Sequence, residues 1–290
     1  MTVGIFGTVF VVLAILVIVL VSVTGNKTNS GVGFGMKPAP AAVVNALTHV
    51  QASAFTDAGS TIGQSGPYTS SLIALKSQPP LTSGGKPEVV YVGANYCPYC
   101  AATRWPFVVA LARFGTFKNL QITESGRNTS EPYPGTPTLS FYHSSYSSPY
   151  ITFKATEQCT DISSSSTSTA VQQCSGYKPL EPMPKDLSKI LLKYDATPYV
   201  PSTDAGSIPF FDFANKFLGV GAFMDPSILG GGLTQVQIAQ SLGNPVASPA
   251  QTILVSANYY TAAICKLTNN KPGSVCDMPV VKQAAKALKL

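Results

Sequence analysis

The order of apolar and polar residues along the chain predicts a mixture of short strands and helices. Residues 88–93 begin with Glu88 and continue as an apolar run rich in β-branched and aromatic side chains, which is typical of a strand covered on both faces. Apolar positions then recur at helical spacing from residue 97 to about residue 114. Further strands are predicted at residues 71–76, 119–124, 138–143, 150–155 and 207–213. Further helices are predicted at residues 41–50, 185–194, 233–242, 249–267 and 279–290, so the fold class is α/β.

Two of the predicted connections are turns. Residues 144–149, rich in Ser and Tyr, should join the strands on either side of them. The glycines of residues 219–221 should form a turn after the strand at residues 207–213.

The first residues predict a membrane anchor. Residues 3–23 carry no charge, and a helix of that length can cross a bilayer. A cleaved signal peptide is the alternative, but it normally has a basic start and a shorter apolar run. We therefore predict an uncleaved transmembrane anchor at residues 1–24. A flexible linker at residues 25–40 and one domain at residues 41–290 should follow.

The composition excludes disorder and gives no nucleic-acid signature. Of the 290 residues, 45% are hydrophobic, which supplies enough apolar surface for a packed core. The net charge of +6 is spread thinly, without the dense basic patch of a nucleic-acid-binding protein.

The six cysteines fall into three sequence-adjacent pairs, as expected of an exported chain. If the two closest cysteines, Cys97 and Cys100, are taken as one pair, the other four can be joined in three ways. Pairing of sequence neighbours is the simplest of these. We predict that the outer cysteines form structural disulfides, and a redox shuttling role for one of them is the alternative. The pairs are Cys97 with Cys100, Cys159 with Cys174, and Cys265 with Cys276.

Two short motifs, at Asn26 and Asn128, fit acceptors of N-glycosylation. Together with the cysteines, they place residues 25–290 outside the cytoplasm. The predicted location is the cell membrane, with a single pass and an extracytoplasmic domain.

Cys97 and Cys100 are the candidate catalytic residues because a strand delivers them to the start of a helix. The partial positive charge at a helix N-terminus favours a thiolate there. We expect Cys97 to be the exposed nucleophile and Cys100, one turn on, to be the resolving thiol. Pro98 and Tyr99 keep the pair close. Arg104 could add positive charge, although a surface role is commoner for arginine.

Other functions for the close pair are a purely structural disulfide or half of a zinc site. Zinc usually needs two close pairs of ligands, and the two histidines, His49 and His143, have no useful spacing. No metal site and no soluble cofactor are therefore predicted.

Residues 91–117, which contain Cys-Pro-Tyr-Cys, resemble the thioredoxin superfamily. They are most similar to an uncharacterised thioredoxin-like family, domain of unknown function 929. Further similar segments lie at residues 136–139, 148–151, 207–210 and 263–265. The resemblance implies a thioredoxin-like mixed sheet with a helical insertion and extra C-terminal helices, following the transmembrane helix.

The resemblance also implies a cis-proline loop that faces the two thiols and pairs with the substrate backbone. Ile208 and Pro209 are the candidates for this loop. Their distance from Cys97 along the chain requires an insertion that carries the Cys159–Cys174 loop. Pro137 is the alternative candidate for the cis-proline. Thioredoxins carry a buried aspartate on the strand below the cysteines. At the comparable position this chain has Tyr91, and the only acidic residue of the strand is Glu88, at its far end. This departure favours an oxidase or isomerase over a reductase.

The hypothesis is a membrane-anchored thiol–disulfide oxidoreductase of cysteine-containing proteins, reoxidised by a membrane redox partner. The alternative is a non-catalytic surface binding or structural module with the same fold. A filament subunit is disfavoured because the charged processing signal before the apolar segment is absent.

Overall fold

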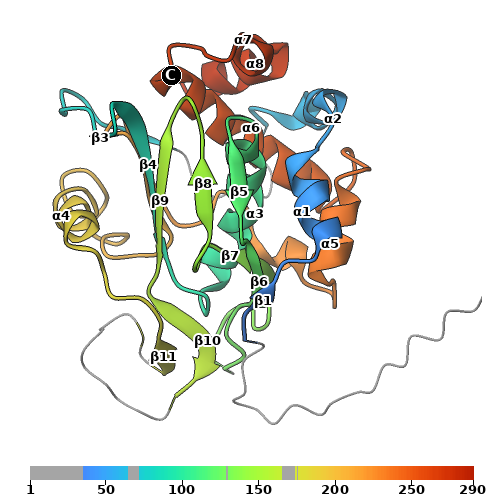
Figure 1. The fold of residues 1–290 in the computed structure, drawn as a ribbon, viewed down its shortest axis with the longest axis vertical. Helices are drawn as coiled ribbons and strands as arrows, with labels where there is room; N and C mark the ends of the chain where they lie inside the picture. The colour runs from blue at the N-terminus through green and yellow to red at the C-terminus, as the bar shows by residue number, and fades with distance from the viewer. Residues whose placement is uncertain (1–34, 65–71, 129, 165–173, 175) are drawn as a thin grey trace, which may run out of the picture.

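A mixed sheet lies at the centre of the computed structural model, which describes residues 35–64, 72–128, 130–164, 174 and 176–290 (Figure 1). Its order is β2-β13-β12-β4-β3, with β9 also paired to β4. The β4–β9 pair is parallel, and the other pairs are antiparallel. The strands are β2 Ile73–Ala74, β3 Thr82–Ser83, β4 Lys86–Gly93, β9 Thr152–Glu157, β12 Phe210–Phe213 and β13 Phe217–Val220.

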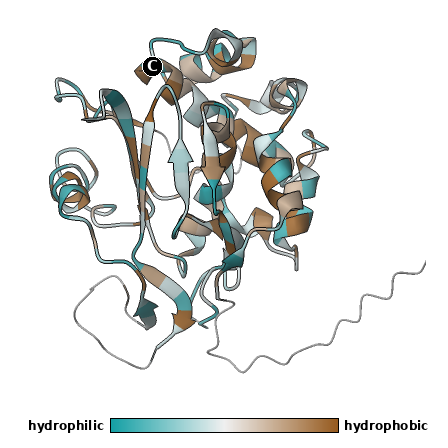
Figure 2. Cartoon of the chain, viewed as in Figure 1, coloured by the Kyte–Doolittle hydropathy of each residue, from teal (hydrophilic) through white to brown (hydrophobic). Residues whose placement is uncertain are grey.

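Both faces of this sheet are covered, as the apolar run at residues 88–93 predicts. Val89 and Tyr91 of β4 pack in the main core, where α3 (Pro98–Ala112) lies against α6 (Ala250–Leu267). Val90 and Val92 pack in a second core with Leu187 of α4 (Lys185–Tyr194). Figure 2 shows α4 striped with hydrophobic and hydrophilic residues, as a helix with one buried face should be.

The remaining elements surround this centre. One smaller sheet contains β1 (Lys37–Pro38), β6 (Gln121–Glu124) and β7 (Pro137–Ser140). Another pairs β5 (Thr116–Lys118) with β8 (Ser145–Ser147), and a further one pairs β10 (Cys159–Ser163) with β11 (Tyr177–Pro179). The other helices are α1 (Ala41–Thr48), α2 (Ala52–Ala58), α5 (Gln235–Ser241), α7 (Gly273–Cys276) and α8 (Pro279–Ala287), with 3₁₀ turns at Gly59–Thr61 and Pro226–Leu229.

The chain joins the fold ahead of the predicted domain boundary at residue 41. The N–H of Gly35 donates to Asp161 Oδ2 at 2.9 Å, and the N–H of Ala39 donates to the Leu120 carbonyl at 2.9 Å. The latter part of the predicted linker is therefore held against β6.

The segment between α3 and β12 differs from the predicted helical insertion. In its described residues it carries the strands β5 to β11, and α4 is its helical part. The predicted Ser/Tyr turn itself contains β8, which pairs with β5. Thr, Ser and Tyr side chains favour an extended backbone over a helix here, because β-branched and aromatic residues fit a pleated surface.

The predicted turn at residues 219–221 is wrong for Gly219 and Val220, which lie in β13; Gly221, with a φ of +80°, bends the chain after the strand. Gly219 pairs with Phe211, and a Cβ added at Gly219 would lie 2.3 Å from the Phe211 ring. The glycine therefore lets the ring approach the neighbouring strand, which is a packing role rather than a turn.

No helix within the described ranges is long and apolar enough to cross a membrane. Residues 3–23, on which the anchor prediction depends, lie outside those ranges, as does Asn26.

Candidate active site

Cys97 and Cys100 lie where β4 ends and α3 begins. Cys97 is the N-cap of α3, and its Sγ accepts a hydrogen bond from the Cys100 N–H at 3.2 Å. Pro98 occupies the first turn, where a missing N–H costs nothing. Neither cysteine is in a disulfide. The strand-to-helix placement that the sequence predicts is therefore present.

The expectation that Cys97 is an exposed thiol is wrong. Its exposed fraction is 5%, and that of Cys100 is 0%. Cys97 Sγ turns back to cap its own helix and lies 3.6 Å from the carbonyl oxygen of Ile208, within reach of a weak S–H···O contact. Cys97 is still the less buried of the two cysteine residues.

Ile208 and Pro209 form the loop that faces the thiols. Their peptide bond is cis, Pro209 directly precedes β12, and the Pro209 carbonyl accepts a hydrogen bond from the Gly221 N–H at 2.9 Å. The rival, Pro137, begins β7, and its carbonyl accepts a hydrogen bond from Trp105 Nε1 at 3.0 Å. The bond before Pro137 is not among the cis bonds of the described residues.

Tyr99 projects from between the two cysteines. Its exposed fraction is 41%, in contrast to the buried thiols on either side. Its ring lies edge-on to that of Tyr133, with centroids 6.0 Å apart. An exposed aromatic pair beside a thiol offers contact area to a peptide.

Cys100 holds its proton firmly. Burial raises its pKa well above the usual value, and the hydrogen bond and charge of Cys97 act in the same direction. The positive charge of Arg104 partly opposes them. A protonated Cys100 is chemically quiet until that balance changes.

Arg104 is fully buried, so the surface role that is commoner for arginine does not apply. Its Nε and Nη2 donate to the two carboxylate oxygens of Glu157 at 2.8 and 2.6 Å, and Nη2 also donates to the Ala94 carbonyl at 2.8 Å. Glu157 Oε1 accepts a further hydrogen bond from the Phe141 N–H at 3.2 Å. The pair joins the first turns of α3 to the end of β9.

Glu157 is the residue of the candidate site that the sequence prediction missed. It ends β9, two residues beyond the strand predicted at residues 150–155, and β9 lies beside β4 only through their parallel pairing. Its one signal in the sequence is an acidic residue just after a predicted strand. β9 thus adds a buried carboxylate to the site, in addition to the Tyr91 and Glu88 side chains of β4.

Tyr91 completes the polar environment below the thiols. Its ring lies 5.9 Å from the Arg104 guanidinium carbon. Burial raises the pKa of its hydroxyl well above the usual value. Within the described residues, the Tyr91 hydroxyl and Arg104 Nη1 have no hydrogen-bond partner. These two groups are the free polar atoms of the cluster.

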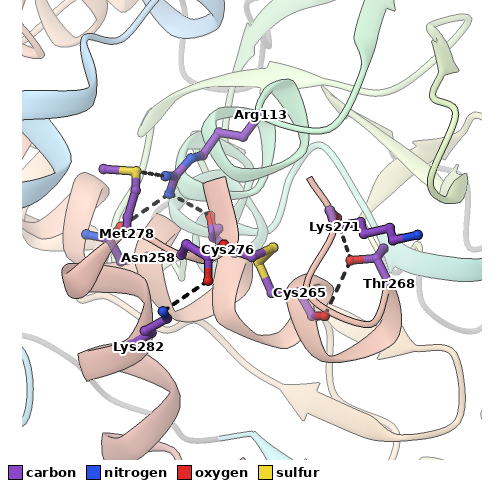
Figure 3. Close-up of a disulfide and its surroundings, with 10 residues drawn as sticks. Arg113, Asn258, Cys265, Thr268, Lys271, Cys276, Met278 and Lys282 are labelled. Carbon is purple, nitrogen blue, oxygen red and sulfur yellow. Dashed lines mark hydrogen bonds and ion pairs between the residues drawn. A yellow bond between two sulfur atoms is a disulfide. The ribbon is translucent and has the colours of Figure 1, made fainter. Parts of the chain in front are cut away.

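The outer cysteines pair as neighbours, which is the simplest of the three arrangements. Cys159 is bonded to Cys174, and Cys265 is bonded to Cys276. Figure 3 shows the second disulfide beside Arg113, whose guanidinium donates to Met278 Sδ at 2.8 Å.

Asn128, the described glycosylation candidate, is partly exposed. Its Oδ1 accepts a hydrogen bond from Ser163 Oγ at 2.9 Å. Among the described residues, no group of three His, Cys, Asp or Glu side chains could hold a metal ion.

Comparison with known proteins identifies the family but adds no biochemistry. No curated protein and no solved structure matches the chain. One family model, described as "Domain of unknown function (DUF929)", matches residues 73–266. That range covers most of the chain, from β2 to the end of α6, and includes both cysteines of the candidate site. The chain therefore belongs to the DUF929 family.

Proposed function

We propose that this protein is a thiol–disulfide oxidoreductase with a thioredoxin-like arrangement around Cys97 and Cys100. The observation that carries the proposal is the position of Cys97 Sγ, at the N-terminus of α3 and 3.6 Å from the carbonyl of Ile208, next to Pro209. A loop of this kind, ahead of β12 and facing the thiols, is what the thioredoxin resemblance implies. Its backbone would pair with the substrate peptide.

The reaction is an exchange of disulfides. A substrate thiolate attacks Cys97 Sγ of the oxidised pair, the Cys97–Cys100 bond breaks, and Cys100 leaves as a thiolate that takes up a proton. A second substrate thiolate then attacks the substrate sulfur of the mixed disulfide, and Cys97 leaves. The substrate loses two electrons and two protons to the pair. In the reverse direction, Cys97 attacks a substrate disulfide, and Cys100 releases the enzyme.

The electrostatics of the pair suit this division of roles. Cys100 has a raised pKa and no exposure, so it keeps its proton while Cys97 meets the substrate. Tyr99 lies beside the reacting sulfur and provides a contact for an unfolded peptide.

The proposed location is extracytoplasmic, with residues 1–24 as a membrane anchor. The two disulfides support an oxidising compartment, where such bonds persist. A membrane redox partner would return the reduced pair to its disulfide, and no soluble cofactor is required.

The test is covalent capture by the full chain in detergent. A synthetic peptide closed by one disulfide is incubated with Cys100→Ala, which leaves Cys97 without its resolving thiol. We expect a stable mixed disulfide at Cys97, no adduct with Cys97→Ala, and only a transient adduct with the wild type.

A non-catalytic structural module is the competing function, and the low exposure of Cys97 is the observation in its favour. It predicts that Cys100→Ala captures no peptide under native conditions, although Cys97 reacts with iodoacetamide once the chain is unfolded. That pair of results would overturn the proposal.

A further inference from the structure

The Cys159–Cys174 disulfide lies beside the candidate active site. Both cysteines form a small buried cluster with Ala94 and Tyr177, against which Tyr96 and Ile208 pack. Tyr96 directly precedes Cys97, and Ile208 is the residue whose carbonyl lies 3.6 Å from Cys97 Sγ. The disulfide and the Cys97 sulfur therefore share two neighbours.

Backbone hydrogen bonds fix this proximity. The N–H of Asn95 donates to the Cys159 carbonyl at 2.9 Å, and the N–H of Gln158 donates to the Gly93 carbonyl at 2.8 Å. Cys174 Sγ lies 3.4 Å from the Gln158 carbonyl. The disulfide thus lies against the end of β4, just where the chain turns into Cys97.

The other disulfide lies at the far end of α3. Arg113, the C-cap of α3, donates to Met278, which closely follows Cys276 (Figure 3). A helix of 15 residues separates that end from Cys97, a span of roughly 22 Å. Figure 1 shows α7 and β10 at opposite ends of the molecule. Cys265–Cys276 is therefore a matched control.

The two cysteine residues differ in exposure within both neighbouring pairs. Cys97 and Cys174 are each 5% exposed, whereas Cys100 and Cys159 are fully buried. Exchange requires that the attacking thiolate reach one disulfide sulfur. Cys97 and Cys174, although buried, are the less buried member of each pair.

We propose that Cys159–Cys174 is a second redox pair, which reoxidises Cys97 and Cys100 within the same chain. This inference rests on the proposed function. The Cys97 thiolate attacks Cys174 Sγ, the Cys159–Cys174 bond breaks, and Cys159 leaves and takes up a proton. The Cys100 thiolate then attacks Cys97 Sγ, and Cys174 leaves. The Cys97–Cys100 pair loses two electrons and two protons, and the Cys159–Cys174 pair gains them.

The relay changes the stoichiometry of the protein. A chain oxidised at both pairs delivers two disulfides to substrate before it needs an external oxidant, whereas a structural Cys159–Cys174 bond allows only one. For continued turnover, the membrane redox partner would renew the reduced outer pair by disulfide exchange, a role that oxidised glutathione can take in vitro.

The test counts disulfides formed in an excess of a reduced two-cysteine peptide, without oxygen or glutathione. We expect two per wild-type chain, with Cys159 and Cys174 found reduced by mass spectrometry. Cys265→Ser/Cys276→Ser should also deliver two, Cys159→Ser/Cys174→Ser should deliver one, and Cys97→Ala/Cys100→Ala should deliver none.

Three results overturn the relay. The first is one disulfide per wild-type chain, with Cys159–Cys174 intact. The second is a disulfide delivered by Cys97→Ala/Cys100→Ala, which would mean direct reduction of the outer pair. The third is no disulfide from the wild type, which contradicts the proposed function and, with it, the relay that rests on that function.

A trapping variant tests the key contact even if Cys159→Ser/Cys174→Ser folds poorly. Cys100→Ala/Cys159→Ala leaves Cys97 and Cys174 unpaired, and mild oxidation should join them. The control, Cys100→Ala/Cys276→Ala, leaves Cys97 and Cys265 unpaired, and these should not join. No Cys97–Cys174 bond in the first variant, or a Cys97–Cys265 bond in the second, would contradict the relay.

Discussion

At the scale of single residues, the ionisation of Cys100 depends on its buried surroundings. Burial and Cys97 raise its pKa, whereas the positive charge of Arg104 lowers it, and Arg104 in turn donates two hydrogen bonds to the carboxylate of Glu157. A buried ion pair contributes little net stability, because desolvation offsets the attraction. Its chemical effect is to set how much positive charge the thiol experiences.

Replacing Glu157 by Gln should lower the pKa of Cys100, because Arg104 loses its counter-charge. Glu157→Gln and its parent are compared in a Cys97→Ser background, so that Cys100 titrates alone. We expect the thiolate absorbance to rise at lower pH in Glu157→Gln than in its parent. Loss of one member of a buried pair should also cost roughly 3–5 kcal/mol in the free energy of unfolding.

The control is Asp186→Asn. Asp186 lies on α4 and pairs with Lys154, which lies on β9, the same strand as Glu157. That pair is exposed, so it should cost about 1 kcal/mol or less and leave the Cys100 titration unchanged. Equal titrations for Glu157→Gln and its parent would contradict the role of the pair.

Asp212 gives the protein a pH-dependent stability that is unrelated to the thiols. Burial raises the pKa of its carboxyl group from 3.8 to about 7, although its Oδ1 accepts a hydrogen bond from the Asn215 N–H at 2.6 Å. The folded state therefore binds this proton more tightly than the unfolded state. Its contribution is complete below about pH 4 and is lost as the pH rises through 7.

Asp212→Asn should remove this dependence. Between pH 4 and pH 8, we expect the free energy of unfolding of the wild type to fall by roughly 4 kcal/mol more than that of the variant. This figure follows from the difference between the folded and unfolded pKa values of Asp212. Urea denaturation at a series of pH values measures the difference. Parallel profiles would show that Asp212 does not titrate in this range.

At the scale of elements, local patterns identify β4, α3 and α4, but they do not identify which strands are neighbours. β4 and α3 are contiguous, so the position of Cys97 at their junction follows from the sequence. Glu157 reaches Arg104 only because β9 pairs with β4 in parallel, through a long connection that leaves no periodic signal. The position of this carboxylate could therefore not be predicted.

The role of Gly219 is a second feature that local sequence patterns do not predict. Glycine usually signals a turn, but here it allows Phe211 to pack over β13, and only the register of the hairpin reveals this.

Gly219→Ala should destabilise the hairpin, because the new methyl group would overlap the Phe211 ring. We expect a loss of about 1–3 kcal/mol in the free energy of unfolding. A matched substitution is Gly206→Ala, where a methyl group meets open space and only the positive φ of +79° is strained. If Gly219→Ala costs no more than Gly206→Ala, the close approach is unimportant.

At the scale of the whole molecule, the two disulfides lie at opposite ends of α3 and should have different roles. Cys265–Cys276 ties α6 to α7, away from the thiols. Its loss should lower stability without altering the exchange chemistry.

Replacing both Cys265 and Cys276 by Ser should cost roughly 2–3 kcal/mol, because the bond closes a short loop. The rate of peptide capture in the Cys100→Ala background should stay unchanged. A tenfold slower capture with the fold intact would show that the two ends of the molecule are coupled.

If the protein is a thiol–disulfide oxidoreductase, Cys97 and Cys100 interconvert between dithiol and disulfide in the folded protein. Equilibration of the full chain in glutathione buffers, followed by acid quenching and mass spectrometry, measures this directly. We predict reversible interconversion with a midpoint of about −120 to −270 mV, the range of known thiol–disulfide oxidoreductases, while Cys265–Cys276 stays oxidised. A pair that keeps one redox state throughout this range, and changes only when the chain unfolds, would contradict the account.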